Sequence, residues 1–300
     1  MLSVVITAWN EEDNISRAIS SVKKIVDEVV VVVDKNTTDK TAELAKKMGA
    51  KVYWHAHTGI VEPMRNFSIS KARGDWILVL DADEEIPSTL ADEIKRLVTS
   101  PEADYYRLPR KDIVFGKWIK SQHWWPDYVY RLFKKGSVTW DDTIHSIPFT
   151  RGKGADLPPD ETHAIIHHHY TSISQYVDRL NRYTDHQIQH LISSGYNFSW
   201  TDLITKPISE FLNQFFARQG YKEGVHGLAL SGLQMFSELV LYLKLWQHSQ
   251  FVTSEISVDE ITHQLTLKAS EYHWWATQAR IDRAPLFLKP FYKIVRRLGL

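Results

Sequence analysis

Two aspartates, Asp81 and Asp83, follow the apolar run 76–80 and are separated by one residue. The run predicts a buried strand, and in an open α/β sheet ligands bind at the carboxyl ends of the strands. Carboxylates this close repel each other unless a cation lies between them or one of them is protonated. The pair therefore predicts a hard divalent ion, Mg²⁺ or Mn²⁺, which usually brings substrate phosphates with it. The alternative is that Asp81 only ends a strand and Asp83 only begins a helix cap.

Other polar residues follow the first two predicted strands. Asp34 ends the β-branched run 29–33, where a carboxylate could accept hydrogen bonds from a base or a ribose. Asp39 could take part in binding or simply cap the next helix. Segment 7–12 could bind a nucleoside. Alternatively, its glutamates could only stabilise the positively charged amino end of the following helix. Arg65 suits phosphate oxygens through its planar guanidinium, with a solvated helix-face charge as the alternative.

The elements that must position these residues alternate between strand and helix over the first hundred residues. Apolar residues recur at helical spacing after each β-branched or apolar run. Ser88 is the expected cap of the last of these helices. The pattern predicts strands at 3–7, 29–33, 51–54 and 76–80, and helices near 15–22, 42–48, 63–72 and 88–98. This order predicts an α/β fold with a mostly parallel sheet covered by helices.

The pattern changes after Tyr105. Residues 105–170 are rich in aromatic residues, proline, glycine and charge, with short strand-like pieces. Helical periodicity returns at 173–192 and in a pair of amphipathic helices over 203–247. It continues to about Arg280, after which Pro285 and Pro290 break it. We therefore expect an α/β part over residues 1–170 and a helical part over residues 171–300.

Composition excludes several classes of function. The 36 basic and 36 acidic side chains cancel, so no overall positive field points to a nucleic-acid partner. The absence of cysteine excludes disulfides and thiol chemistry.

The amino terminus has no signal-peptide pattern, and no uncharged apolar stretch reaches the length of a membrane-spanning helix. The nearest stretch, Leu228 to Trp246, is interrupted by Gln234, Glu238 and Lys244. We expect a cytoplasmic protein.

Taken in order, these segments resemble the family 2 glycosyltransferases, the inverting GT-A class that uses nucleotide-sugar donors. The resemblance is carried by residues 3–12, 31–34, 38–39, 65–66 and 74–84. A bacterial branch linked to lipopolysaccharide core and other surface glycans is similar over a longer stretch. That likeness extends the resemblance to roughly residues 2–250 through segments 124–127, 131–133, 169–170 and 211–227.

The resemblance implies a GT-A type fold, a mostly parallel sheet flanked by helices, with a C-terminal helical appendage. Residues 1–170 would be the nucleotide-sugar-binding and catalytic domain, and residues 171–300 would contact the acceptor or a membrane. It also implies site roles. Asp34 would contact the base, Asp81 the ribose or the metal, and Arg65 the diphosphate region, while Asp83 would ligate the metal. The nucleoside pocket would be lined by Thr7, Ala8 and Glu11.

Some positions depart from the family pattern. The family often has proline where Ala8 stands, and small residues where Lys35 and Asn36 stand. These departures leave the donor base and sugar open. The bacterial branch tends to have glutamate where this chain has Ser146, which leaves the acceptor side open.

The implied reaction is a single in-line displacement at the anomeric carbon, with the metal neutralising charge on the departing diphosphate. One group must deprotonate the acceptor hydroxyl. The candidates in the loop after Trp140 are Asp141, Asp142 and His145, each of which could instead be a solvated turn residue.

The histidine run 167–169 offers a further contact. Strand alternation places His167 and His169 on one face, which could supply a contact to the metal or to the diphosphate, with His169 as the candidate metal ligand. Zinc is disfavoured because no cysteine accompanies the histidines and carboxylates prefer harder ions. The alternative is that both histidines only pack within a strand.

The acceptor is expected to be a glycan or a lipid-linked hydroxyl. Trp118, Trp124, Trp125 and Trp140 could form a sugar platform or a small core. The amphipathic helices 203–247, with the basic residues Arg296 and Arg297 later in the chain, could lie on the inner face of a membrane. They could equally pack on each other or on a second subunit of a homo-oligomer.

Two other functions compete with glycosyl transfer. One is a catalytically silent nucleotide-sugar-binding scaffold. The other is a phosphatase of the haloacid dehalogenase type, although its Asp-x-Asp pair normally follows the first strand and here it follows the fourth. A dinucleotide oxidoreductase is disfavoured because no G-x-G-x-x-G follows any strand.

Overall fold

The computed structural model describes residues 1–58, 61–121, 124–141 and 147–298. The chain forms two compact units, one of Met1–Val114 with Trp124–His169 and one of Phe115–His123 with Tyr170–Leu300. The roles assigned above to residues 1–170 and 171–300, catalysis and acceptor or membrane contact, remain predictions.

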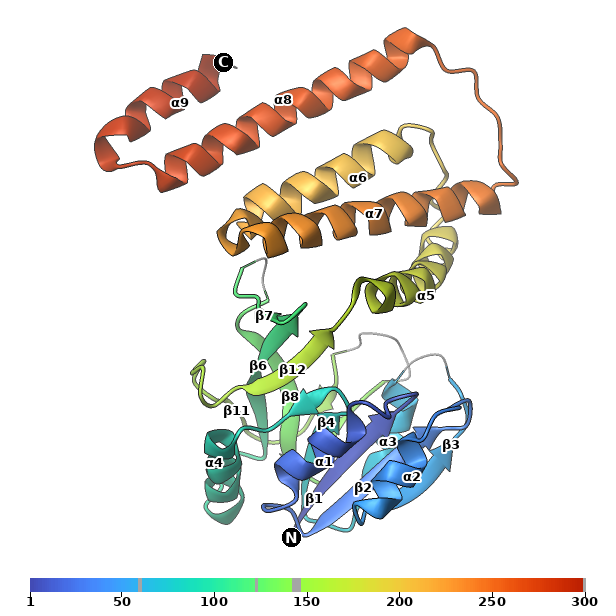
Figure 1. Ribbon diagram of the computed structural model, residues 1–300, viewed down its shortest axis with the longest axis vertical. Coiled ribbons are helices and arrows are strands. Elements are labelled where there is room, and N and C mark those ends of the chain that lie inside the picture. Colours follow the sequence, from blue (N-terminus) through green and yellow to red (C-terminus); the bar gives the residue numbers. More distant parts are fainter. Residues whose placement is uncertain (59–60, 122–123, 142–146, 299–300) are drawn as a thin grey trace. The chain divides into compact units, whose positions relative to one another are not determined.

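The first unit is built on one large sheet with the strand order β3-β2-β1-β4-β8-β6-β12-β5, and β11 pairs with β6 (Figure 1). Its parallel half consists of β1 (Leu2–Ala8), β2 (Glu28–Asp34), β3 (Lys51–His55) and β4 (Trp76–Asp81). The remaining strands are β5 (Glu84–Glu85), β6 (Tyr105–Val114), β8 (Asp127–Lys134), β11 (Gly154–Asp156) and β12 (Ile165–Tyr170). Strand β8 runs antiparallel to both β4 and β6. A separate antiparallel pair consists of β9 (Val138–Thr139) and β10 (Phe149–Thr150). The predicted GT-A type sheet is confirmed.

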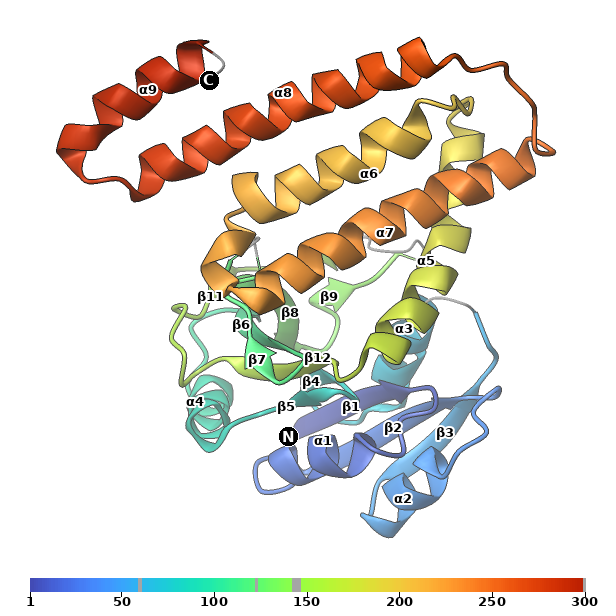
Figure 2. The ribbon, with the colours of Figure 1, turned by 45° about the horizontal axis from the view of Figure 1, so that its top comes forward.

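Alternate side chains of the parallel strands build two cores, one on each face of the sheet. Val4, Ile6 and Leu78 share one core with apolar side chains of α1 (Ile15–Val22), α2 (Thr41–Lys47) and α4 (Ser88–Thr99). Val5, Ile77 and Val79 share the other with Met64 of α3 (Glu62–Lys71). Helices therefore cover both faces, which is why the strands are apolar on both sides. Figure 2 shows the same helices from a second angle.

Strand register places the predicted site residues at one edge. Thr7 of β1 lies opposite Asp81 of β4 and opposite Val32 of β2, and Ala8 lies opposite Val33. Because these strands are parallel, their carboxyl ends bring Thr7, Asp34 and Asp81 to the same edge of the sheet.

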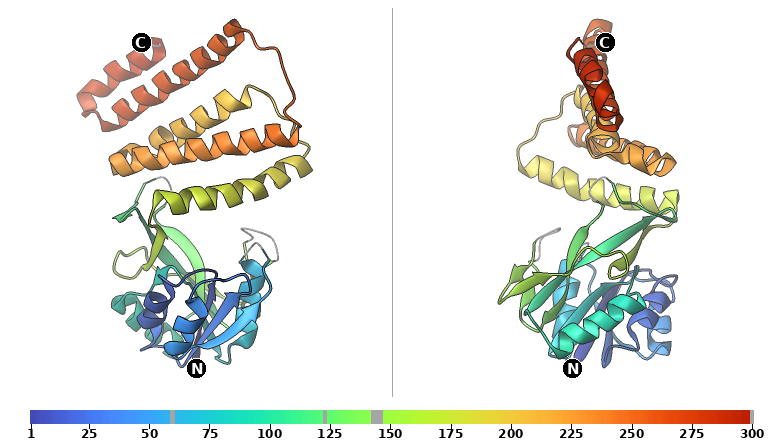
Figure 3. Two further views of the ribbon diagram at one scale, coloured as in Figure 1. Left: turned by 45° about the vertical axis from the view of Figure 1, so that its right-hand side comes forward. Right: turned by 90° about the vertical axis from the view of Figure 1, so that its left-hand side faces the viewer.

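The second unit is mainly helical. It contains β7 (Lys117–Trp118) and the helices α5 (Ile173–Ser193), α6 (Asp202–Leu212), α7 (Val225–His248), α8 (Val258–Arg283) and α9 (Lys289–Leu298). Helices α6 and α7 lie side by side, as do α8 and α9 (Figure 3). Ile188 of α5 packs with Leu241 and Leu245 of α7.

Three expectations need correction. Ser88 does not cap α4, because the cap position is Pro87 and no side chain caps the helix. The chain does not lose helical structure after Pro285, because α9 begins at Lys289 and has Pro290 in its first turn, where the missing N–H costs nothing.

The third correction concerns α7, which by length and composition could cross a membrane and is the one such helix in the described part of the chain. Only 28% of its most apolar stretch is buried within the protein, and length and composition alone are weak grounds for a membrane span.

Candidate functional site

The carboxylate of Asp81 is held by two arginines. Arg65 Nη2 donates to both oxygens, at 2.9 Å and 3.0 Å, and Arg131 Nη2 donates to Oδ2. Burial favours the protonated form of Asp81, but the charges of Arg131 and Arg65 overcome this effect and lower its pKa. Asp81 is therefore ionised and already neutralised by the protein. Two guanidiniums therefore supply part of the positive charge that the Asp81–Asp83 pair requires.

Glu84 and two arginines extend this network into the protein. Arg131 Nη2 donates to Glu84 Oε1 at 2.7 Å, and Arg110 Nη1 donates to the same oxygen at 3.1 Å. Glu84 Oε2 accepts the backbone N–H of Asp81 at 3.0 Å. Arg110 also pairs with Asp127 at 2.6 Å. Glu84 and Arg131 are almost fully buried, so these contacts fix the turn that carries both aspartates.

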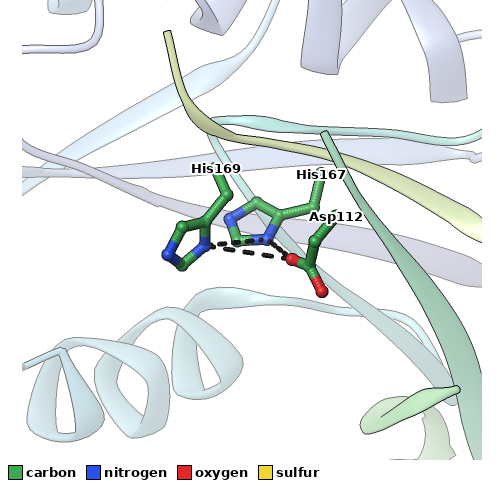
Figure 4. Close-up of side chains that lie close together, drawn as sticks. All are labelled: Asp112, His167 and His169. Carbon is green, nitrogen blue, oxygen red and sulfur yellow. Dashed lines mark hydrogen bonds and ion pairs between the residues drawn. The ribbon is translucent and has the colours of Figure 1, made fainter. Parts of the chain in front are cut away.

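Asp83 lies in a second group, with two histidines and another carboxylate. His167 Nε2 is 3.3 Å from Asp83 Oδ2, and His167 Nδ1 is 2.5 Å from Asp112 Oδ1. His169 Nδ1 is 3.3 Å from His167 Nδ1 and 3.9 Å from Asp112 Oδ1. Figure 4 shows the two imidazoles and the Asp112 carboxylate converging from neighbouring strands β12 and β6.

His167 carries a proton between two carboxylates. Burial alone would lower its pKa, but the negative charge of Asp83 and the hydrogen bond with Asp112 raise it to about 9. Burial raises the pKa of Asp112, and the hydrogen bond with His167 counters this shift only in part. The local negative charge therefore exceeds what the arginines neutralise, and a proton on His167 offsets part of the excess.

These residues suit a divalent ion. Single ligand atoms of Asp112, His167 and His169 all lie within 4.8 Å of one another, and Asp83 contacts the same His167. Carboxylate oxygens suit Mg²⁺ and Mn²⁺, and imidazole nitrogens favour transition ions, so the mixed set fits Mn²⁺ better than Mg²⁺. Metal ligands must be deprotonated, so an ion bound by His167 would replace its proton.

Asp34 lies at the end of β2 with both oxygens engaged. It is buried, its Oδ1 accepts the backbone N–H of Asn36 at 2.8 Å, and its Oδ2 lies 2.8 Å from His57 Nδ1. The His57 ring lies 5.3 Å from the ring of exposed Trp9. This arrangement sets a carboxylate, an imidazole and an indole together at the ligand edge of the sheet.

The segment after β1 is tied to the segment after β2. The backbone N–H of Glu11 donates to Thr41 Oγ1, and the side chain of Glu11 accepts from Asn14. Asp39 accepts from the backbone N–H of Glu12 and from Thr41. Burial favours protonated Asp39, but these hydrogen bonds lower its pKa. Asp39 thus holds the first residue of α2 in place, but it is not the cap residue, because the cap position is Lys40 and no side chain caps this helix.

The acceptor-side candidates are less defined. Asp141 is exposed, whereas Asp142 and His145 lie outside the described residues, as does Ser146. Trp140 is buried. Its backbone carbonyl accepts from Asn66 Nδ2 at 2.7 Å, and its backbone N–H donates to Asn66 Oδ1 at 3.1 Å. The Arg65 guanidinium lies 5.7 Å from the Trp140 ring. The predicted sugar platform therefore loses Trp140, which belongs to the core, while Trp124 lies edge-on to His169.

The structure brings most of the predicted residues to one edge but adds partners that the sequence analysis missed. Thr7, Asp34, Arg65, Asp81 and Asp83 fall there as expected. The missed residues are His57, Glu84, Arg110, Asp112 and Arg131. The available signal was a charged residue inside a strand pattern, as at Asp112 and Arg131, because a buried charge requires a partner.

The chain is similar in sequence to known glycosyltransferases. A profile described as "Glycosyl transferase family 2" matches residues 3–154. An uncharacterized glycosyltransferase of Rickettsia typhi is 34% identical over 81% of this chain and 86% of its own length. One from Rickettsia conorii is 32% identical over 83% of this chain and 90% of its own length.

Solved structures show weaker likeness. Glucosyl-3-phosphoglycerate synthase from Mycobacterium tuberculosis, in complex with Mn²⁺, uridine diphosphate and glucosyl-3-phosphoglycerate, is 23% identical over 39% of this chain and 44% of that chain, with a TM-score of 0.31. S. aureus TarS 1–349 is 15% identical over 99% of this chain and 87% of that chain, with a TM-score of 0.42. Likeness at this level says nothing about the activity of this chain.

Proposed function

This chain belongs to glycosyl transferase family 2, and from that premise we propose that it moves a sugar from a nucleotide-diphosphate donor to an acceptor hydroxyl with inversion at the anomeric carbon. The enzyme is a glycosyltransferase, so the phosphatase and silent-scaffold alternatives fall away. The observation that carries the proposal is that carboxylates outnumber guanidiniums at the edge of the sheet where Asp83 contacts His167.

The donor nucleoside would bind across the ends of β1 and β2. Thr7, Ala8 and Glu11 would line its pocket, and Asp34 would accept a hydrogen bond from the base. Each Asp34 oxygen has a second lone pair, so the contacts with Asn36 and His57 leave it able to accept another hydrogen bond. Trp9 and His57 would supply flat surfaces beside the base.

The donor diphosphate would lie beside Asp83, where a divalent ion would be held by Asp83 with His167 or His169. Such an ion, Mg²⁺ or Mn²⁺, would neutralise charge that develops on the departing diphosphate. Asp81 would meet the ribose or the same ion through the face that its arginines leave open. Arg65 would assist the diphosphate. Its side chain is 14% exposed, so part of it is accessible to a ligand while Nη2 holds Asp81.

Arg131 would act as a positioning residue. Its Nη2 pairs with both Asp81 and Glu84. Arg131 belongs to β8, whereas Asp81 ends β4 and Glu84 begins β5, so this contact holds the β4–β5 turn against β8. A fixed carboxylate does not have to reorganise during the reaction, and this preorganisation is the main source of electrostatic stabilisation in enzymes.

The base that deprotonates the acceptor would come from the segment after Trp140, where Asp141, Asp142 and His145 are the candidates. The acceptor would be a glycan or a lipid-linked hydroxyl in lipopolysaccharide or surface polysaccharide synthesis, with the enzyme on the cytoplasmic face of the membrane. Nucleic acid is not a proposed partner, because the charges of the chain balance.

Thermal shift with UDP, GDP and CMP, each with and without Mn²⁺, tests the donor class. We expect stabilisation by one nucleoside diphosphate that requires the metal. Donor turnover by wild type and by Asp83→Ala then tests the site. Stabilisation without metal, or equal turnover by the two proteins, would contradict the proposal.

A further inference from the structure

The segment from Leu286 to Leu298 exposes an unusual set of apolar side chains. It consists of a short 3₁₀ turn, Leu286–Leu288, followed by α9. Four side chains form what we call the apolar ridge: Leu286 is 85% exposed, Phe287 78%, Phe291 59% and Ile294 59%. Phe291 and Ile294 are three residues apart and lie on one side of α9. Phe287 belongs to the turn before the helix, four residues ahead of Phe291.

The same segment is strongly basic. Its charged residues are Lys289, Lys293, Arg296 and Arg297, and no aspartate or glutamate occurs after Asp282. The chain as a whole carries equal numbers of basic and acidic side chains, so this positive charge is a local feature. Lys293 and Arg297 are exposed and one helical turn apart, which places them together along one flank of the ridge.

Within the described part of the second unit, α8 packs against one side of α9. Arg296 donates to Gln278 Oε1 of α8, and its guanidinium lies 5.3 Å from the Trp274 ring. Tyr292 and Val295 are half-buried on this side. Helix α9 thus lies beside α8 (Figure 3) and is anchored to it, while the side chains of the ridge and of its basic flank are exposed.

We propose that α9 and the turn before it bind the surface of an anionic phospholipid bilayer, with the apolar ridge among the acyl chains and Lys293 and Arg297 at the headgroups. A large apolar face beside a basic face is the composition of a helix that lies in a membrane interface. A second copy of this segment is disfavoured as the occupant, because two surfaces of the same positive charge repel each other. The exposed apolar residues of α7 lack this feature, since that helix carries Glu238 as well as Lys244.

This inference deepens the proposed function. It rests on that function only for the claim that the acceptor is lipid-linked, because a bilayer-bound enzyme would meet such an acceptor at the membrane surface. Lipid binding and donor binding involve different residues and are measured separately.

Flotation of the full chain with vesicles tests the inference. We expect the protein to float with phosphatidylglycerol-containing vesicles at low salt and to remain at the bottom with pure phosphatidylcholine. Lys293→Gln with Arg297→Gln should lower the partition coefficient about 25-fold, because each basic residue near an anionic surface contributes roughly a fivefold factor. Phe287→Ser, Phe291→Ser and Ile294→Ser together should lower it about 100-fold or more.

Two matched variants control for general effects. Lys24→Gln with Lys95→Gln removes two exposed lysines of the first unit, and Leu265→Ser with Leu267→Ser removes two exposed leucines of α8. Both should float like wild type. The inference is overturned if wild type does not float with anionic vesicles, if the α9 variants float unchanged, or if they only convert a dimer to a monomer. Nucleotide thermal shift on the same variants should be unchanged, which separates this result from failure of the proposed function.

Discussion

The two ends of the parallel sheet each carry a buried carboxylate cluster, and the clusters differ in charge balance. At the amino end Glu28 accepts hydrogen bonds from Ser3 Oγ, Lys51 Nζ and two groups of Arg73. One carboxylate there faces two cationic side chains. At the carboxyl end five carboxylates face three guanidiniums and two imidazoles, namely Asp81, Asp83, Glu84, Asp112 and Asp127 with Arg65, Arg110, Arg131, His167 and His169.

The contrast teaches that burial of charge does not by itself mark a site. The Glu28 carboxylate accepts four hydrogen bonds, two of them from cationic side chains, and this cluster serves stability. The carboxyl-end cluster retains excess negative charge at the edge where α/β sheets bind ligands. An additional cation is needed only there, and the proton of His167 meets part of that need.

The largest expected effect comes from breaking the carboxyl-end network. Arg131→Met should lower the free energy of unfolding by about 3–5 kcal/mol, because Asp81 and Glu84 lose a buried partner. Urea unfolding measures the change. Arg107→Met is the control, since Arg107 pairs with Asp156 on an exposed surface and should cost at most about 1 kcal/mol. Equal losses in the two variants would contradict the assignment.

Removal of one negative charge at Asp83 should affect catalysis more than folding. Asp83→Asn should reduce donor turnover about 10²–10³-fold, the usual cost of losing one preorganised electrostatic contact. Steady-state turnover at saturating metal measures the effect, and the unfolding midpoint shows that the variant remains folded. Activity within a few-fold of wild type would place the site elsewhere.

The amino-end cluster should show the opposite behaviour. Burial would raise the pKa of Glu28, but hydrogen bonds from Lys51, Arg73 and Ser3 lower it to about 2. A lowered pKa stabilises the fold above the ordinary glutamate range near 4.5, and the stability is lost as pH falls from there toward 2. Glu28→Gln should therefore cost about 2–3 kcal/mol at pH 7 and almost nothing near pH 2.

Urea unfolding across this pH range measures the Glu28 effect, and turnover per folded molecule should stay at the wild-type value. A cost that does not change with pH, or a loss of turnover in the folded variant, would remove the distinction between the two ends.

The smallest expected effect concerns the nucleoside end. His57→Phe removes the hydrogen bond to Asp34 while keeping a ring beside Trp9. Nucleotide affinity should fall about fivefold, corresponding to roughly 1 kcal/mol for one hydrogen bond. Calorimetric titration measures it, and an unchanged affinity would show that His57 does not support base recognition.

The order of elements and the ligand edge were predictable, because five consecutive β-branched residues before Asp34 and the apolar run before Asp81 specify buried parallel strands. The partners of Asp81 and Asp83 were not predictable. Arg131 is 50 residues from Asp81 along the chain, and Asp112 is 55 residues from His167. Strand order across β4, β8, β6 and β12 brings them together, and periodicity carries no information about that order.

Helix α9 was missed for a local reason. Two prolines five residues apart predict an interruption, but Pro290 falls in the first turn of a helix, where its fixed φ is compatible with helical structure. The amphipathic spacing of Phe287, Phe291 and Ile294 was the signal that outweighed it.

The central claim is that the excess charge around Asp83 receives a divalent ion together with a nucleoside diphosphate. Anomalous diffraction from crystals grown with Mn²⁺ and UDP, GDP or CDP tests it directly. The account predicts a manganese peak at coordination distance from an Asp83 oxygen, with a diphosphate on its far side. A bound nucleotide with no manganese beside Asp83, or manganese only at the Glu28 end of the sheet, would contradict it.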